Sequence, residues 1–214
     1  MYPSGNLFIP VAHGQLEAIL KEPRESPPKG VALVLHPHPL GGGTMHNKVV
    51  FRAAAALNDA GLTTLRINFR GVGQSTGAHD FGKGELDDAK AGLSYLAEHY
   101  PGQDIIVCGF SFGAWMGMEV GSNDEQVKLL ISIGTPLSKY DFSFLEHCRK
   151  PLLFVHGAND EFGDTQELRS LADKLAQTIP IKLVVIPDTG HFFEGHLDEL
   201  KSAIYDWVEA QLER

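Results

Sequence analysis

The sequence predicts an α/β protein with one mostly parallel, twisted sheet of about eight strands, an antiparallel N-terminal hairpin, and helices on both faces. Two observations support this fold class. Short, uninterrupted apolar runs recur along the chain, as expected for strands that are buried on both faces of a sheet. Longer segments with helix start and stop signals separate these runs. Alternation of this kind requires crossover connections, which are right-handed.

The elements follow in chain order. Residues 7–11 and 15–21 flank Ala12-His13-Gly14, which predicts a small antiparallel hairpin. Apolar runs then predict parallel strands at residues 31–35, 63–69, 104–108, 129–133, 152–155 and 182–186. Helices are predicted at residues 48–60, 84–99, 112–120, 165–178 and 197–212, and most of them end next to Gly or Pro.

Length and composition predict a single domain over residues 1–214. A chain of 214 residues that is 43% hydrophobic can bury one sizeable core. The net charge of −9 and the lack of clustered Lys and Arg argue against nucleic-acid or membrane partners. We find no leader and no apolar run near the roughly 20 residues that span a bilayer. We therefore expect a cytoplasmic monomer or homodimer, with two free, non-catalytic thiols at Cys108 and Cys148.

The segment Gly109-Phe110-Ser111-Phe112-Gly113 has the G-x-S-x-G pattern of a nucleophile elbow. In such an elbow a serine sits on a sharp strand-to-helix turn, and the glycines on either side give the turn its room. An apolar run precedes this segment and a helix-compatible run follows it, so the context agrees. The sequence therefore predicts that Ser111 is a nucleophile. The alternative is a glycine-rich packing turn around an ordinary buried serine.

Two loops after later strands supply partners for Ser111. His191 follows the predicted strand at 182–186, in a turn where an imidazole can take a proton from a serine hydroxyl. Asp160 follows the strand at 152–155 and can orient that imidazole. Asp164 is an alternative acid, although its place before a helix predicts an N-cap, and Glu161 is a more distant candidate.

An oxyanion hole requires backbone N–H groups that point at the attacked carbonyl oxygen. The amide of Phe112, which follows the nucleophile, is one predicted donor. The second should come from the loop after residues 31–35, where Pro37 and Pro39 lack an N–H group. Leu40 and His38 are the favoured donors, and a following glycine is the alternative.

Two other site types are less well supported. His36, His38 and His46 cluster in sequence, but no acidic partner and no helical histidine pair accompanies them, so we predict no metal. The Gly71-Val72-Gly73 segment lacks the third glycine and the following helix of a phosphate cradle. We therefore predict a catalytic site that needs no cofactor.

The connection at residues 137–150 is short, which predicts little or no cap over the site. An open site of this kind suits short acyl chains. Aromatic residues near the loops are candidates for its walls, and we select Phe192, Tyr140 and Phe142 as substrate-binding residues. Trp115 and Phe110 are expected to belong to the core.

The chain order of Ser111, Asp160 and His191 resembles that of the α/β-hydrolase superfamily. The segments at residues 36–47 (HPHPLGGGTMHN) and 68–75 (NFRGVGQS) look more narrowly like a group of small, lidless bacterial hydrolases. This group is related to the dienelactone hydrolases and the acyl-peptide-hydrolase-type esterases. The resemblance covers nearly the whole chain and implies the α/β-hydrolase fold with a minimal cap or none.

The resemblance also implies a function. A serine hydrolase would cleave small carboxylic esters by two-step acyl transfer, with Ser111 as nucleophile, His191 as base and acid, and Asp160 as orienter. Dienelactone hydrolases themselves use cysteine at the elbow, so Ser111 argues against a dienelactone substrate. A thioesterase, an acyltransferase or a small peptidase would use the same residues. A pseudohydrolase that only binds ligands is the non-enzymatic alternative.

Overall fold

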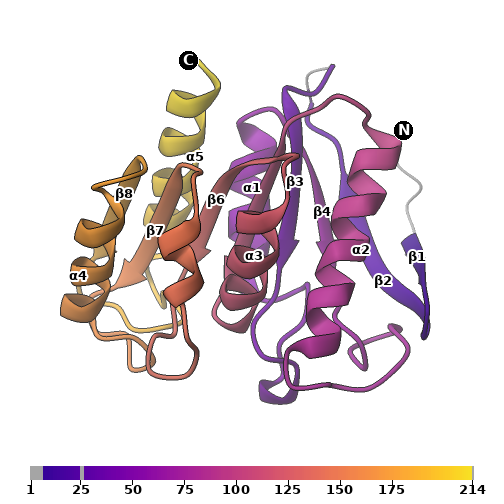
Figure 1. Cartoon of the computed structure of the whole chain (residues 1–214), viewed down its shortest axis with the longest axis horizontal. Coiled ribbons are helices and arrows are strands. Elements are labelled where there is room, and N and C mark those ends of the chain that lie inside the picture. The colour runs from indigo at the N-terminus through magenta and orange to yellow at the C-terminus, as the bar shows by residue number, and fades with distance from the viewer. Residues whose placement is uncertain (1–6, 25–26, 214) are drawn as a thin grey trace.

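A computed structural model of the protein describes residues 7–24 and 27–213, which form one eight-stranded sheet with α-helices packed on it (Figure 1). The strands are β1 Leu7–Val11, β2 Gly14–Lys21, β3 Gly30–Leu35, β4 Leu62–Ile67, β5 Ile105–Phe110, β6 Val127–Ile133, β7 Leu152–Gly157 and β8 Ile181–Ile186. The α-helices are α1 Lys48–Asp59, α2 Lys83–His99, α3 Phe112–Asn123, α4 Thr165–Leu175 and α5 Leu197–Leu212.

The strand order is β1-β2-β4-β3-β5-β6-β7-β8. Strand β2 pairs antiparallel with both β1 and β4, and every other neighbouring pair is parallel. The predicted fold class is therefore confirmed, including the N-terminal hairpin. The connection between β6 and β7 holds only a short 3-10 helix, Ser143–His147, so no cap domain is inserted there.

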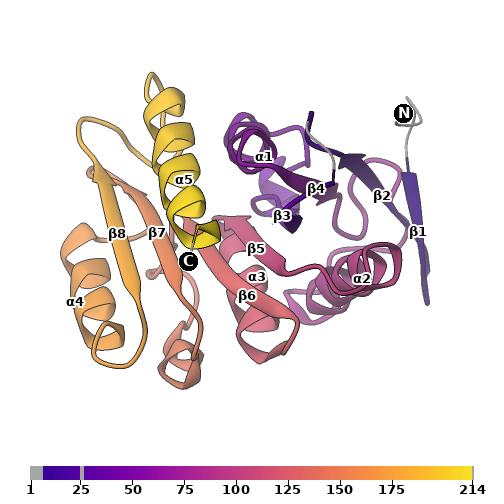
Figure 2. The same cartoon turned by 90° about the horizontal axis from the view of Figure 1, so that it is seen from above.

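The helices form two layers around the sheet. Helices α1 and α5 cover one face, and α2, α3 and α4 cover the other (Figure 2). Adjacent residues of a central strand face opposite layers, as in β3, where Leu33 packs towards α2 and α3 and Val34 packs towards α1. Because both faces are buried, all six residues of β3, β4, β5 and β7 are buried. This explains the unbroken apolar runs in the sequence.

Two helix ends differ from the sequence prediction by more than one residue. Helix α3 continues beyond residue 120 to Asn123, because the side chains of Ser122 and Asn123 donate hydrogen bonds to the Glu119 carbonyl and close the last turn. Helix α4 ends earlier than predicted, at Leu175. None of the helices in the described ranges is long and apolar enough to cross a membrane.

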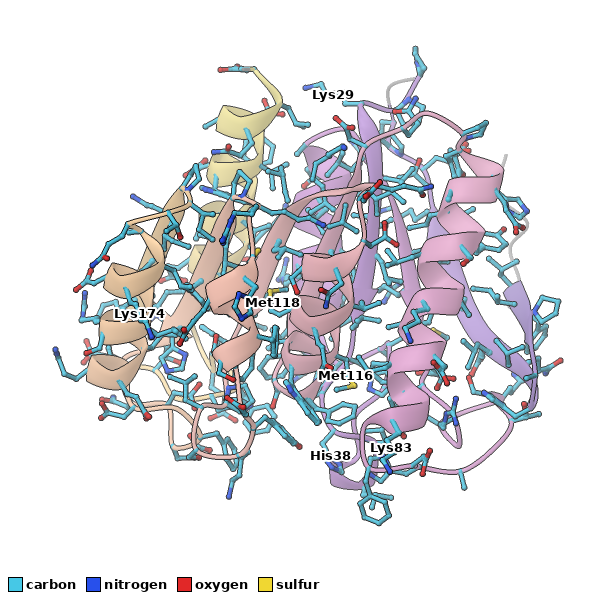
Figure 3. All side chains as sticks on the ribbon, viewed as in Figure 1. Lys29, His38, Lys83, Met116, Met118 and Lys174 are labelled. Carbon is cyan, nitrogen blue, oxygen red and sulfur yellow. The ribbon has the colours of Figure 1, made fainter. Side chains whose placement is uncertain are left out.

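The parallel strands all end at the same edge of the sheet, so the loops that follow them gather at one end of the molecule. Figure 3 shows His38, from the loop after β3, near Lys83 at this end. Lys29, which precedes β3, lies at the opposite end. The sequence-predicted site residues lie in the loops at the first of these ends.

Candidate active site

Ser111 occupies the turn between β5 and α3 and has a strained backbone, with φ 56° and ψ −119°. Its amide donates a hydrogen bond to the Ile133 carbonyl at 2.9 Å, which fixes the turn against β6. A Cβ atom at Gly109 would overlap the backbone of Gly113, and one at Gly113 would overlap the Leu35 carbonyl. Both motif glycines are therefore required by close backbone packing.

Ser111, His191 and Asp160 are joined by a continuous chain of hydrogen bonds. His191 Nε2 lies 2.8 Å from Ser111 Oγ, and His191 Nδ1 lies 2.8 Å from Asp160 Oδ2. A carboxylate can only accept, so in the neutral imidazole Nδ1–H donates to Asp160 and Nε2 accepts from the serine hydroxyl. The structure thus brings together the three residues that the sequence selects, from loops after β5, β7 and β8.

Three phenylalanine rings enclose the His191 imidazole. The Phe162 ring meets it edge-on with centroids 4.6 Å apart, Phe110 lies at 4.9 Å, and Phe192 stands perpendicular at 5.2 Å. His191 is only 2% exposed as a result. The packing holds the ring in one orientation and limits the water that reaches it.

Asp160 is held by its own loop. Its Oδ1 accepts a hydrogen bond from the Phe162 amide at 2.8 Å, and its backbone amide donates to the Gly157 carbonyl. His156, at the end of β7, is fully buried, and its Nε2 contacts the Gly163 carbonyl at 2.7 Å. That bond closes the loop that carries Asp160. The other ring nitrogen of His156 lies 3.7 Å from Asp160 Oδ2 and has no hydrogen bond among the described residues.

The two alternative acids have other roles in the structure. Asp164 caps α4, because its Oδ1 accepts hydrogen bonds from the amides of Gln166 and Glu167 at 2.9 Å each. Glu161 accepts a hydrogen bond from the His191 backbone amide at 3.4 Å and does not contact the imidazole nitrogens. Asp160 is the carboxylate that reaches His191 Nδ1.

The predicted oxyanion donors differ in whether their backbone amides already have a hydrogen-bond acceptor. Phe112 is the first residue of α3, so its amide has no helical acceptor and remains available beside Ser111. The prediction for Leu40 is wrong, because its amide donates to His38 Nδ1 at 3.1 Å and its side chain is 73% exposed. Gly41 and Gly43 both donate to the His38 carbonyl at 3.0 Å, and the Gly42 amide donates to the Pro39 carbonyl at 3.2 Å. The His38 amide has no partner in the described part of the chain, so it is free to donate, and its role as the second oxyanion donor stays a prediction.

His36 anchors the start of this loop. Its Nε2 accepts a hydrogen bond from the Phe69 amide at 3.0 Å, so its Nδ1 carries the proton and donates to the Pro37 carbonyl at 2.6 Å. Burial lowers the pKa of His36 to about 4, which keeps the ring neutral. Burial and the neighbouring His79 also lower the pKa of His38. In the described ranges no group of three His, Cys, Asp or Glu residues is arranged to hold a metal.

A cavity of about 370 Å³ opens at Ser111 and His191. Its other walls are Pro37, His38, Gly41, Gly42, Gly43, Asn47, Pro136, Lys139, Tyr140, Phe162 and Phe192. Tyr140 is held by Trp115, whose ring stacks on it at 4.3 Å and 6°. Tyr140 and Phe192 thus lie where the sequence prediction puts them.

The prediction for Phe142 is wrong, because this ring is 3% exposed and belongs to the core beneath α3 rather than to the cavity. Sequence reasoning missed Phe162, Asn47, Pro136 and Lys139 as walls. Only Phe162 had a usable signal, since it follows Asp160 by two residues. The thiols of Cys108 and Cys148 are both buried, and burial raises the pKa of Cys108 well above its ordinary value.

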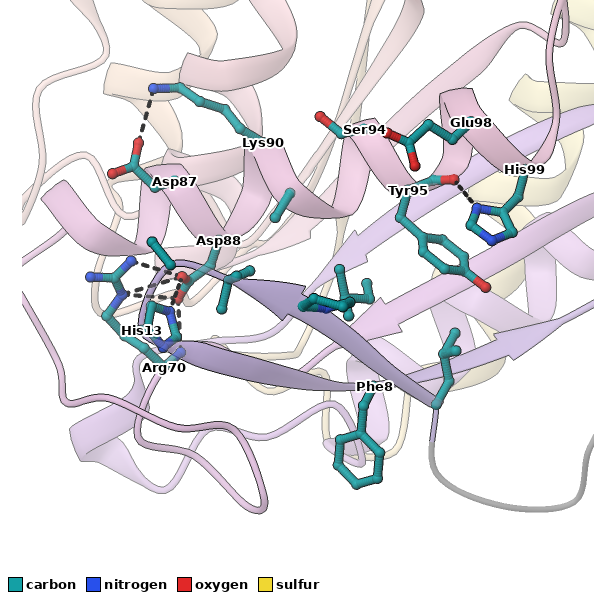
Figure 4. A pocket seen from close by; sticks show the side chains of 16 residues that line it. Phe8, His13, Arg70, Asp87, Asp88, Lys90, Ser94, Tyr95, Glu98 and His99 are labelled. Carbon is teal, nitrogen blue, oxygen red and sulfur yellow. Dashed lines mark hydrogen bonds and ion pairs between the residues drawn. The ribbon is translucent and has the colours of Figure 1, made fainter.

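A larger cavity, of about 1020 Å³, lies between β1 and α2, away from this site (Figure 4). At one end of it the Asp88 carboxylate, only 1% exposed, accepts hydrogen bonds from the Arg70 guanidinium and lies 3.1 Å from His13 Nε2. These groups satisfy one another and join the hairpin to α2. None of Ser111, His191 and Asp160 lines this cavity.

Comparison with known proteins agrees with this geometry. Residues 74–212 match the dienelactone hydrolase family. The chain belongs to the dienelactone hydrolase family. An uncharacterized protein of Rickettsia prowazekii is 41% identical over 190 residues, which cover 86% of this chain and 80% of that protein.

Solved structures give the same picture. An α/β serine hydrolase homologue from Coxiella burnetii superimposes with a TM-score of 0.90 at 36% identity, over 96% of this chain and 98% of that one. A lidless α/β serine hydrolase from Xanthomonas campestris gives 0.88 at 34% identity, over 100% and 98%. The expected superfamily is therefore confirmed, and this dienelactone hydrolase family member is an α/β hydrolase.

Proposed function

We propose that this protein is a serine esterase that cleaves small carboxylic esters by two-step acyl transfer. The observation that carries the proposal is the hydrogen-bonded chain from Ser111 Oγ through His191 to Asp160, with 2.8 Å at each step, at the base of the 370 Å³ cavity. The relative from Xanthomonas campestris is described as a serine hydrolase and the one from Coxiella burnetii as a serine hydrolase homologue, which fits a serine at the elbow.

In the first step, Ser111 Oγ attacks the ester carbonyl carbon while His191 Nε2 takes the hydroxyl proton. The carbonyl oxygen becomes an oxyanion, and the amides of Phe112 and His38 donate hydrogen bonds to it. Asp160 stabilises the positive charge that forms on His191. His191 then gives its proton to the leaving alcohol oxygen, the C–O bond breaks, and an acyl-enzyme remains.

In the second step, His191 takes a proton from a water molecule, which attacks the acyl carbon through the same oxyanion arrangement. Collapse of this intermediate returns the proton to Ser111 Oγ and releases the carboxylic acid. Every proton is carried by His191, so these residues need no cofactor for the chemistry.

The site favours short acyl groups. The cavity is bounded by aromatic rings on one side and by the loop after β3 on the other, and the β6–β7 connection builds no cap above it. A long chain would therefore leave most of its methylenes in water, where they contribute nothing to binding.

The first experiment is covalent labelling with a fluorophosphonate probe, comparing the wild type with Ser111→Ala. We expect the wild type alone to be labelled, and to hydrolyse p-nitrophenyl acetate and butyrate. Failure of the wild type to react with either reagent would leave only the pseudohydrolase alternative. Acyl thioesters and peptide amides, tested with the same enzyme, separate an esterase from a thioesterase or peptidase, and added alcohols detect acyl transfer.

A further inference from the structure

A second cavity, of about 520 Å³, adjoins the one at Ser111. Gly42, Asn47 and Phe192 line both cavities and form the boundary between them. The remaining walls of the second cavity come from the segment 44–49, which leads into α1, and from the turn that follows His191. The site is thus a two-part groove rather than a single pocket.

The second cavity borders the turn that follows His191. Its walls include the residues that come directly after His191, the group that protonates the leaving oxygen in the proposed mechanism. That turn is firmly placed, because Phe193 is fully buried with φ 54° and its amide donates to the Gly190 carbonyl. Phe192 is consequently turned outward, and its ring remains 48% exposed between the two cavities.

The two cavities differ in chemistry. Five aromatic and proline rings contribute to the walls near Ser111, namely Pro37, Pro136, Tyr140, Phe162 and Phe192. In the second cavity, half of the lining residues have hydrogen-bonding side chains, namely Thr44, His46, Asn47, Lys48 and Glu194. Lys48 and Glu194 carry opposite charges, so an ionic ligand would meet repulsion from one of them as well as attraction from the other. These walls suit a neutral ligand that carries several hydroxyl groups.

An exposed aromatic ring beside several hydrogen-bonding side chains matches the two kinds of surface on a sugar ring. The C–H face of the sugar can pack on the Phe192 ring, and its hydroxyls can reach the polar side chains. The Asn47 carboxamide is oriented for this, because its Oδ1 accepts from the Val49 and Val50 amides and leaves the NH₂ group free to donate.

We propose that the second cavity is a leaving-group subsite for a polyhydroxylated alcohol, so that the substrate is a sugar or similar polyol that carries a small acyl ester. This inference rests on the proposed esterase function and adds the alcohol half of the substrate to it.

The test compares two acetate esters of similar shape. Methyl 6-O-acetyl-glucopyranoside carries ring hydroxyls, and cyclohexylmethyl acetate has a six-membered ring without them. We expect kcat/KM for the sugar ester, normalised to the hydroxide-catalysed rate of each ester, to be greater by at least about tenfold, the effect of one or two added hydrogen bonds. Equal values, or a preference for the cyclohexyl ester, overturn the inference.

Variants of the cavity walls test whether the preference for the sugar ester arises in the second cavity. Glu194→Ala and His46→Ala should each reduce the sugar-to-cyclohexyl ratio about three- to tenfold, mainly through KM for the sugar ester. Glu194→Trp should fill the cavity and lower activity on both bulky esters relative to methyl acetate. The matched control is Glu125→Gln, which changes an exposed carboxylate in the turn before β6, at the opposite end of the sheet. A ratio that does not respond to the subsite variants also overturns the inference.

Failure of this inference is distinguishable from failure of the esterase proposal. An enzyme that hydrolyses p-nitrophenyl acetate but shows no sugar preference keeps the esterase function and loses the polyol subsite. An enzyme that reacts with neither acetate nor fluorophosphonate loses both.

Discussion

The two halves of the candidate site use different groups of the chain, side chains in one half and backbone amides in the other. On one side, after β5, β7 and β8, the proposed reacting groups are the side chains of Ser111, Asp160 and His191, which are joined by hydrogen bonds. On the other side, the loop after β3 contributes mainly backbone, since its candidate oxyanion donor is the His38 amide. The first half therefore depends on which residues stand at these positions. The second half depends on the backbone conformation of its loop.

This difference explains the outcome of the two sequence predictions. Serine, aspartate and histidine are few and chemically distinct, so a motif and its position after a strand can select them. Every residue except proline has an amide, so the sequence could not distinguish Leu40 from His38. Only the hydrogen bond from the Leu40 amide to His38 Nδ1 separates them, and that bond depends on a short 3-10 turn.

The largest expected effect tests the side-chain half. Ser111→Ala removes the attacking oxygen, and we expect ester hydrolysis to fall by at least about 10³-fold. The turn is fixed by its neighbouring glycines and by the Ser111 amide, so thermal unfolding should be little changed. Residual activity above about a hundredth of wild type would indicate another nucleophile.

The next prediction compares two aspartates four residues apart. Asp160→Asn should lower kcat by roughly 10³- to 10⁴-fold, because an amide cannot hold the same His191 tautomer or stabilise its positive charge. Asp164→Asn is the matched control, since asparagine is an equally good helix N-cap and activity should stay within about twofold. Steady-state kinetics on one p-nitrophenyl ester measures both, and equal losses would remove Asp160 from the triad.

The fold could be predicted almost completely, because its signals are local and repeated. Both faces of β3, β5 and β7 are buried, so each of these strands contains a continuous apolar run. The walls of the site could be predicted less well. Phe142 and Tyr140 lie two residues apart in the same aromatic connection, yet one packs into the core and the other stacks on Trp115 at the cavity. That choice is made by tertiary packing, which the sequence pattern does not encode.

The backbone half is tested through the stability of its anchor, His36. The unfolded chain binds a proton at this residue below about pH 6.5, whereas burial holds the folded pKa at about 4. The titration of His36 therefore lowers the free energy of unfolding as the pH falls from 6.5 to 4, by up to about 3 kcal/mol. Above pH 6.5 the residue is neutral in both states and the full stability is present.

His36→Gln removes the titrating group while keeping a donor and an acceptor. We expect the free energy of unfolding in urea to fall by about 3 kcal/mol less in the variant than in wild type between pH 7 and pH 4. The variant will be less stable at pH 7 if its hydrogen bonds are imperfect, so the comparison uses the pH slope of each protein. Parallel slopes would contradict a buried neutral His36.

The smallest effect concerns the cavity between the two halves. Each methylene that enters a fitted pocket contributes about 0.8 kcal/mol, so kcat/KM rises steeply with chain length only while the chain stays buried. The β6–β7 connection builds no cap above the cavity of about 370 Å³. We expect kcat/KM to rise a few-fold from acetyl to butyryl p-nitrophenyl esters and to gain nothing at octanoyl or palmitoyl, all measured below their micelle concentrations. If palmitate were the best substrate, an apolar surface beyond the described walls would have to cover the chain, and the open-site interpretation would be wrong.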